Sequence, residues 1–332
     1  MNLDKLYKIL EGQPKYRVQQ AKDVIFKKLA SNWSEATNLS KELIEQLNKA
    51  CPLEIAGQIF ASKDNKTTKV LITLVDDFKI ETVMLTHKDG RHTVCVSTQV
   101  GCPLGCTFCA TGKLGLKRNL EVGEILEQVL FFSRILKATN ERVSNIVFMG
   151  MGEPFLNYKN TIKAISYLNE DLGIGARHIS ISTSGIIKGI EKLTNEKMQI
   201  NLAISLHAPN DKLRSELMPI NKQFPLKDLL KAVDKYIAKT GRRVMFEYLM
   251  IKGINDNPSH ATQLADLMKK PLHMVNLIPY NPTDVFLPSD KKTIANFKNI
   301  LEQAGIAVTQ RYSFGQDIDA ACGQLANKAK VK

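Results

Sequence analysis

The sequence predicts an α/β protein in which helices cover a parallel sheet and a small all-α domain precedes it. Apolar residues at helical spacing dominate residues 1 to about 65, and β-branched segments alternate with amphipathic helices after about residue 120. Six or so β/α units of this spacing imply a parallel sheet. Periodicity leaves open whether the sheet is doubly wound or a full or partial barrel. In each case the active site is expected at the carboxyl ends of the strands.

The amino-terminal region, residues 1–66, is predicted to be a helical accessory domain. Its first helix carries an apolar stripe from Leu3 to Leu10 and is interrupted by Pro14. A second helix is expected over 18–29, and a third starts near Ser40, a residue type that favours helix caps.

A β-rich connection is predicted over 67–88, because two short segments, 69–75 and 80–85, are rich in β-branched residues. The main domain is predicted over 89–322, and a basic tail over 323–332.

The main domain is built from alternating strands and helices in this reading. The predicted strands are 93–97, 145–149, 178–182, 200–205, 244–250, 274–278 and a segment near 308. The predicted helices are one that starts after Asn119, as its cap, and others at about 161–168, 187–193, 226–237, 261–268 and 293–304.

Composition indicates a cytosolic protein that attracts polyanions. The formal net charge is +13, and the amino terminus lacks the basic and apolar segments of a signal peptide. No apolar run approaches the length of a membrane span. Basic residues recur around predicted loops, namely Lys113, Lys117, Arg118, Lys212, Arg214, Lys222, Arg242 and Arg243.

Three of the six cysteines lie within eight residues, as Cys102, Cys106 and Cys109. In a reducing cytosol this clustering indicates a metal site and not a disulfide framework. Three thiolates occupy three corners of a cubane cluster and leave one iron open for chemistry. The alternative is a structural zinc site, which needs a fourth ligand such as His92 or Cys95.

Polar and glycine residues follow four of the predicted strands. They are Gly152-Glu153, Ser182-Thr183-Ser184-Gly185, Ser205-Leu206-His207 and Tyr280-Asn281-Pro282. Because the carboxyl ends of parallel strands meet at one edge, these groups are expected to share a site.

The C-x3-C-x2-C spacing resembles the cluster motif of the radical-SAM superfamily, and further strings resemble the RlmN family of rRNA and tRNA adenine methyltransferases. These strings are Cys106–Gly112, Gly115–Leu120, Gly150–Pro154, Ser182–Gly185, Ser205–Asn210, Leu217–Asn221 and Asp317–Leu325, with Pro14–Arg17 and Thr37–Ser40 matching the helical accessory domain. The resemblance covers essentially the whole chain. It implies a partial (β/α) barrel and a [4Fe–4S] cluster that binds S-adenosylmethionine.

The resemblance also implies a mechanism that consumes two S-adenosylmethionine molecules per turnover. Cys322 takes a methyl group from the first molecule, and a radical formed from the second removes a hydrogen from that methyl. The methylene radical adds to the adenine, Cys95 releases the product through a transient disulfide with Cys322, and Glu81 is the expected proton acceptor. The residues expected to bind S-adenosylmethionine are Gly152, Glu153, Ser182, Ser205, Leu206, His207 and Asn281.

The implied substrates are an adenosine of the peptidyl-transferase centre in 23S rRNA and the adenosine next to the anticodon in tRNAs, each methylated at carbon 2. A cytosolic electron donor such as flavodoxin or ferredoxin is implied, and we expect a monomer without a membrane partner.

Two alternatives stay open. The Cfr family uses the same apparatus to methylate carbon 8 of the rRNA adenine and confers antibiotic resistance. Ser313-Phe314-Gly315 and Cys106–Gly112 favour it, whereas Glu153–Asn157 and the helical domain favour carbon 2. The other alternative is a non-catalytic RNA-binding protein stabilised by zinc or a cluster.

Overall fold

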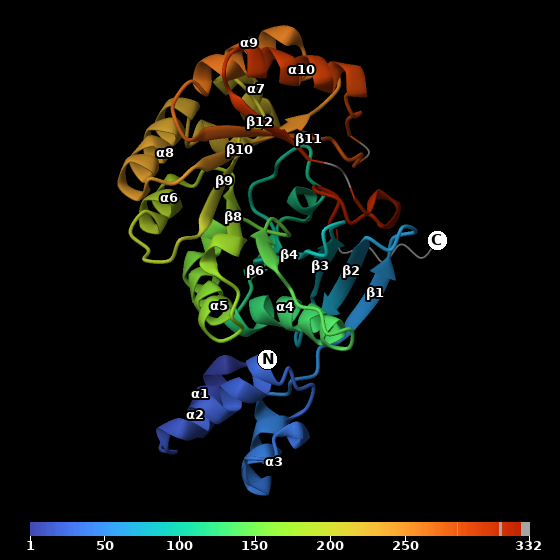
Figure 1. Cartoon of the computed structure of the whole chain (residues 1–332), viewed down its shortest axis with the longest axis vertical. Coiled ribbons are helices and arrows are strands. Elements are labelled where there is room, and N and C mark those ends of the chain that lie inside the picture. The colour runs from blue at the N-terminus through green and yellow to red at the C-terminus, as the bar shows by residue number, and fades with distance from the viewer. Residues whose placement is uncertain (284, 312–313, 327–332) are drawn as a thin grey trace.

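The structure is a computed structural model that describes residues 1–283, 285–311 and 314–326. A group of helices at the amino terminus stands below a larger α/β body (Figure 1). Ser313, which entered the comparison of two families, and tail residues 327–332 lie outside the described residues.

The amino-terminal domain contains α1 (Leu3–Leu10), α2 (Lys15–Lys22) with a π-helical turn after it, and α3 (Lys41–Ala50). The Ser40 hydroxyl accepts a hydrogen bond from Leu43 N and caps α3, as predicted. Trp33 is fully buried between these helices, and its Nε1 donates to the Cys51 carbonyl at 2.7 Å.

A ten-stranded sheet forms the core of the α/β body, in the order β1-β2-β3-β4-β7-β8-β9-β10-β11-β12. Its antiparallel part comprises β1 (Gly57–Ala61), β2 (Thr67–Thr73), β3 (Lys79–Thr86) and β4 (His92–Cys95). Its parallel part continues from β4 through β7 (Asn145–Phe148), β8 (Ile179–Thr183), β9 (Asn201–Ser205), β10 (Val244–Met250), β11 (His273–Pro279) and β12 (Ala307–Gln310).

The ten-stranded sheet extends across two of the predicted domain boundaries. β1 lies inside the range 1–66 that was predicted to be helical, and it pairs residue by residue with β2. The predicted connection 67–88 contains β2 and β3, which belong to the same sheet as the parallel strands.

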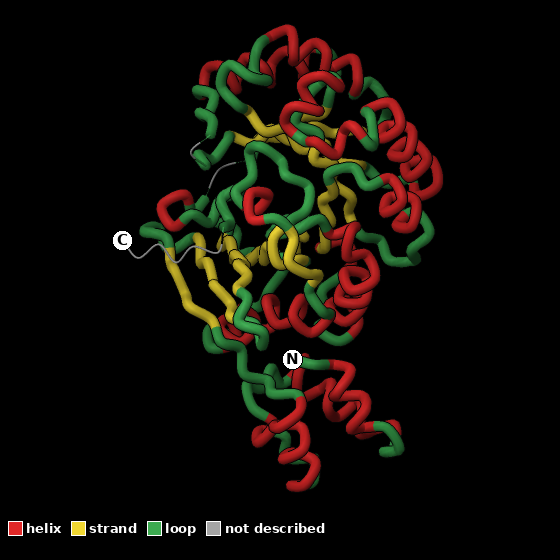
Figure 2. Tube along the Cα trace, turned by 180° about the vertical axis from the view of Figure 1, so that it is seen from behind, coloured by secondary structure: helices red, strands yellow, loops and turns green. Residues whose placement is uncertain are grey.

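Helices cover the outer face of the curved sheet, and the inner face is filled by loops (Figures 1 and 2). These helices are α4 (Val122–Lys137), α5 (Tyr158–Glu170), α6 (Ile187–Leu193), α7 (Asp211–Leu217), α8 (Leu226–Thr240), α9 (Pro258–Leu267) and α10 (Lys291–Gln303). Because β1 and β12 are the two ends of the sheet and do not pair, the body is a partial barrel.

Local capping explains two further differences from the prediction. α4 is capped by Glu121, which forms a capping box with Glu124, and not by Asn119. Asn119 instead ends β6 (Leu116–Asn119), which pairs with β5 (Gln99–Gly101) in a small second sheet. The short helix α7 was not predicted; Asn210 caps it.

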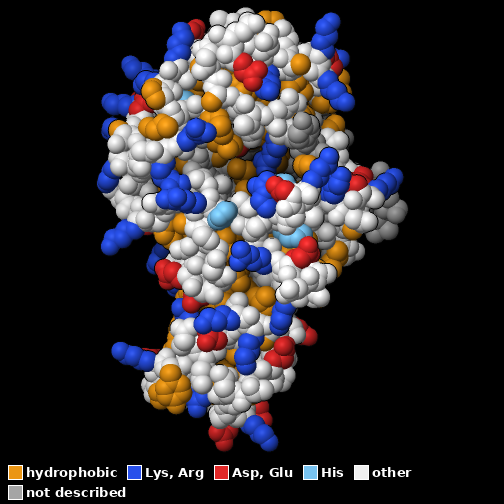
Figure 3. Space-filling view, viewed as in Figure 1, with side chains coloured by type: hydrophobic (Ala, Val, Ile, Leu, Met, Phe, Trp, Pro, Cys, Tyr) orange, Lys and Arg blue, Asp and Glu red, His pale blue; other side chains and the backbone are white. Residues whose placement is uncertain are grey.

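The part of the chain that the structure describes contains no helix with the length and apolarity of a membrane span. Lys and Arg side chains are spread over the face of the body shown in Figure 3 and surround a hollow in it.

Candidate active site

The cysteine loop lies between β5 and β6, and backbone contacts fix both of its ends. Cys102 N donates to the Gly115 carbonyl at 3.1 Å, and Thr107 N donates to the Leu217 carbonyl at 3.0 Å. Gly101 has a φ of +78°, and a Cβ there would overlap the Gly115 oxygen. Only glycine therefore permits this entry into the loop.

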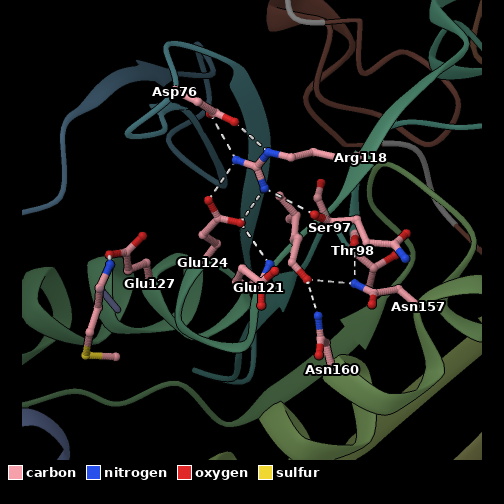
Figure 4. Close-up of polar contacts among 12 residues, drawn as sticks. Asp76, Ser97, Thr98, Arg118, Glu121, Glu124, Glu127, Asn157 and Asn160 are labelled. Carbon is pink, nitrogen blue, oxygen red and sulfur yellow. Dashed lines mark hydrogen bonds and ion pairs between the residues drawn. The ribbon is translucent and has the colours of Figure 1, made fainter. Parts of the chain in front are cut away.

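A polar frame holds the two strands that carry the loop (Figure 4). The Arg118 guanidinium, from β6, forks between the Asp76 and Glu124 carboxylates with contacts of 2.6–2.9 Å. Asn157 Nδ2 donates to the carbonyls of Thr98 and Leu120, both at 2.8 Å. The sequence placed Arg118 among basic loop residues, but its charge is already paired.

One cavity at the carboxyl ends of the parallel strands contains most of the predicted site. It is lined by Cys102, Cys106 and Cys109 together with Gly152, Glu153, Ser182, Ser205, His207 and Cys322. The structure therefore brings the cysteine loop beside the polar and glycine residues that follow the parallel strands. Two predicted binding residues lie elsewhere: Leu206 is fully buried in the core, and Asn281 lines an adjoining cavity.

The three loop cysteines line the cavity together and could hold an iron–sulfur cluster. His92, one suggested fourth zinc ligand, does not line the cavity and contacts Thr86 and Glu141 instead. Burial raises the pKa of the Cys102 thiol to about 12, so binding to a cation would have to supply the energy of deprotonation.

Glu153 and His207 are fixed by backbone contacts in the same cavity. The Glu153 carboxylate accepts from Phe155 N at 3.0 Å and from Ser184 N at 2.7 Å, and burial raises its pKa. His207 Nδ1 accepts from Leu249 N at 3.1 Å, which leaves the proton on Nε2. Burial lowers the pKa of His207 to about 3, so the ring is neutral at physiological pH.

Cys95 and Cys322, which are far apart in the sequence, line one cavity next to the first. Cys322 also lines the first cavity, together with the three loop cysteines. Burial, and then the neighbouring Cys322, raises the pKa of Cys95 to about 12. The two cysteines thus share the lining of the second cavity.

The segment that carries Cys322, residues 314–326, is attached to the cysteine loop. Ala110 N donates to the Gly323 carbonyl at 2.8 Å, and the Thr111 hydroxyl donates to the Leu325 carbonyl at 2.6 Å. Asn281 Nδ2 donates to the carbonyl of Cys322 at 3.1 Å. Asn281 therefore supports the loop of Cys322 in this structure.

Glu81 is not among the residues that line either cavity. Its Oε1 lies 2.9 Å from the Lys69 ammonium, and its Oε2 accepts from Ala326 N at 2.7 Å. Both side chains are almost fully buried. In this arrangement Glu81 anchors the end of the 314–326 segment.

Sequence reasoning missed two charged groups in the cavities, Arg311 and Glu247. Glu247 had a visible signal, a single acid within the apolar strand β10, but Arg311 had none. Sequence reasoning also misplaced Arg214, which it took for a basic loop residue. Arg214 is fully buried and donates to the carbonyls of Ser184, Ser205 and Leu206.

Comparison with known proteins extends over the whole chain. A model of the radical SAM superfamily matches residues 96–265. The chain is 47% identical to a probable dual-specificity RNA methyltransferase RlmN of Dictyoglomus thermophilum, over 98% of this chain and 94% of the other. The corresponding protein of Bacillus cytotoxicus is also 47% identical, over 96% and 90% of the two chains. A crystal structure of a radical SAM methyltransferase from Sphaerobacter thermophilus superposes with a TM-score of 0.94 and 43% identity, covering 99% of this chain and 98% of that one.

Proposed function

The chain belongs to the RlmN family of radical-SAM RNA methyltransferases, and from this premise we propose that it methylates carbon 2 of an adenosine in 23S rRNA and in tRNA. One observation carries the methyl-transfer mechanism: Cys95 and Cys322 line one cavity, and Cys322 also lines the cavity of the cysteine loop. A non-catalytic RNA-binding protein has no use for this placement of two further thiols. The choice of carbon 2 over carbon 8 is supported by the relatives, which bear the RlmN name.

The residues that we propose to bind the cofactors line the first cavity. Cys102, Cys106 and Cys109 would hold a [4Fe–4S] cluster, and Gly152, Glu153, Ser182, Ser205 and His207 would surround S-adenosylmethionine. When bound, the cluster and S-adenosylmethionine together supply a methyl group and a carbon-centred radical. Leu206 and Asn281 would act behind this surface, through the backbone and through the Cys322 loop.

In this proposal Cys322 carries the methyl group, and Cys95 releases the product by forming a disulfide with Cys322. The Cys322 thiolate accepts a methyl group and later loses one hydrogen atom from it, which accounts for two S-adenosylmethionine molecules per turnover. The methylene carbon then bonds to the adenine, and the adduct keeps one unpaired electron. That electron would have to pass to a one-electron acceptor, a role that the cluster held by Cys102, Cys106 and Cys109 could fill after it has given one electron to S-adenosylmethionine. The Cys95 thiolate attacks the Cys322 sulfur, a disulfide forms, and the electron pair of the broken sulfur–carbon bond passes to the carbon, which takes up a proton as the methyl group.

Glu81 is proposed to take the proton that leaves the modified ring carbon. In the structure its carboxylate is engaged by Lys69 and by the amide of Ala326. Release of the 314–326 segment from Glu81 would therefore have to precede this step.

The surface around the site supports an RNA substrate. Lys113 and Lys117 are exposed beside the cysteine loop, and the net charge of +13 favours a polyanion. A cytosolic flavodoxin or ferredoxin is proposed as the electron donor, with the protein acting as a monomer in the cytoplasm.

The test replaces Cys322 by Ala in an anaerobic assay with 23S rRNA. We expect RNA methylation to disappear while the chain still incorporates roughly four irons, as a cubane requires. Cys51→Ala is the matched control, because Cys51 is buried in the helical domain and lines neither cavity. Robust methylation by Cys322→Ala would refute the mechanism, and 8-methyladenosine as the wild-type product would move the chain's activity to that of the Cfr family.

A further inference from the structure

Arg311 brings a positive charge to the thiols of the site. It follows β12, and its backbone N donates to the Leu277 carbonyl at 2.9 Å. Its Nη1 lies 3.9 Å from Cys322 Sγ and 3.5 Å from Met149 Sδ. Arg311 and Cys322 both line the two cavities, so the guanidinium reaches the thiol at the junction between them.

Among the described residues that line the two cavities, Arg311 is the only cation. The other titratable groups there are Cys95, Cys102, Cys106, Cys109, Glu153, His207, Glu247 and Cys322. His207 does not compensate for a negative charge, since burial keeps its ring neutral. Any thiolate that forms at position 322 in the cluster-free site therefore has one positive neighbour.

The guanidinium remains charged in this setting. The pKa of Arg311 is raised, first by the nearby Cys322 and then, against the effect of burial, by Glu247 and Cys95. Glu247 is itself held in place, since its Oε2 accepts from Asn276 Nδ2 at 2.8 Å. The Glu247 carboxylate and Cys322 thus both interact electrostatically with the Arg311 guanidinium.

We propose that Arg311 is a catalytic residue that activates Cys322 for methyl transfer by stabilising its thiolate. Cys322 is half-buried, and a guanidinium beside a thiol favours its thiolate form. In the step itself, the thiol proton leaves to solvent and a sulfur electron pair forms the bond to the methyl carbon. The carbon–sulfonium bond breaks, its electron pair stays on sulfur, and S-adenosylhomocysteine departs.

This inference rests on the proposed role of Cys322 as methyl acceptor, and its test does not use that role. Cluster-containing protein, kept anaerobic and reduced, is treated with iodoacetamide in the absence of RNA and S-adenosylmethionine. The rate of Cys322 alkylation is followed by peptide mass spectrometry across a series of pH values. Iodoacetamide is uncharged, so its reaction reports the thiolate fraction directly.

Arg311→Met removes the charge and keeps much of the side-chain length. We expect its alkylation profile to move upward by about one pH unit, which is a tenfold slower reaction below both midpoints. Arg311→Lys should restore most of the rate. The matched control is Arg243→Met, because exposed Arg243 also contacts a methionine sulfur, at 3.7 Å from Met274, but lines neither cavity.

An unchanged profile in Arg311→Met with full iron content would overturn the proposal. If that variant fails to take up iron, Arg311→Gln and Arg311→Lys at full iron content provide the same comparison of neutral and charged side chains. If Arg311 instead serves only to bind S-adenosylmethionine, the KM for it will rise while alkylation stays at the wild-type rate, and the proposal is wrong. Failure of Cys322→Ala to abolish methylation would refute the proposed function and with it the role of Arg311 in methyl transfer, whereas the alkylation series would still report the effect of Arg311 on the Cys322 thiol.

Discussion

The ion pair between Lys69 and Glu81 should control how firmly the 314–326 segment is held. Lys69 Nζ and Glu81 Oε1 are 2.9 Å apart, with side-chain exposures of 3% and 1%. Replacing Lys69 by Met removes one partner of a buried ion pair, which costs about 3–5 kcal/mol in comparable pairs. Part of this cost falls on the segment, because Glu81 also accepts from Ala326 N and Lys69 lies 3.5 Å from the Asp319 carbonyl.

Hydrogen exchange followed by mass spectrometry measures the expected loosening. If about 3 kcal/mol is lost locally, amides of the 314–326 segment should exchange on the order of a hundredfold faster. The double variant Lys69→Met/Glu81→Gln removes both charges and should recover part of the loss. Lys298→Met, in the exposed Lys298–Glu302 pair, is the control and should change stability by less than about 1 kcal/mol. The reasoning would be refuted if the stability losses of Lys69→Met and Glu81→Gln, measured singly, added up in the double variant. Unchanged exchange in the 314–326 segment of Lys69→Met would refute it as well.

Three further predictions concern the cysteine loop, the cavity and the helical domain. Gly101→Ala should sharply reduce the iron bound per chain, because the new Cβ overlaps the Gly115 oxygen. Gly105→Ala is the control: Gly105 also has a positive φ but has open space around it. This variant should lose only about 1–2 kcal/mol of stability and should retain iron. For His207, the folded pKa of about 3 lies below the ordinary value of 6.5, so the unfolded chain binds more protons between these values and stability falls as pH falls through that window. The loss amounts to about 2 kcal/mol at about pH 5. Urea titrations of His207→Asn, which keeps an acceptor and tolerates the residue's φ of +58°, should show that dependence removed. Trp33→Phe leaves the Cys51 carbonyl without its donor and should destabilise the protein by about 1–3 kcal/mol in thermal unfolding followed by circular dichroism, whereas Tyr16→Phe, at an exposed position, should melt like wild type.

The parallel part of the sheet could be predicted because its strands are buried and its helices are strongly amphipathic. β8, β10 and β11 start and end within one residue of the predicted bounds. β1 was missed because its residues are mostly exposed, so the sequence Gly57–Ala61 shows no buried face. Its strand conformation depends on pairing with β2, which is a tertiary fact.

The candidate site could likewise be predicted only in part from the sequence. The spacing of Cys102, Cys106 and Cys109 indicates a metal site, because ligands that are close in sequence can converge from one loop. Arg311 could not be found in this way, since nothing local distinguishes an arginine after an edge strand from a solvated one. Arg214 shows the reverse error, because its apparent place in a basic loop conceals a buried side chain that binds three carbonyls.

The attachment of the 314–326 segment bears on how the enzyme matures. Lys63 N donates to the Asp317 carboxylate at 2.9 Å across 254 positions of sequence. Contacts with such separation close late in folding, since they carry a large loop-closure entropy. Before they close, Ala110 and Thr111, which follow Cys109, lack their hydrogen bonds to Gly323 and Leu325. We therefore expect iron and sulfide to be delivered to the nascent site first, with Cys322 folding over a finished cluster.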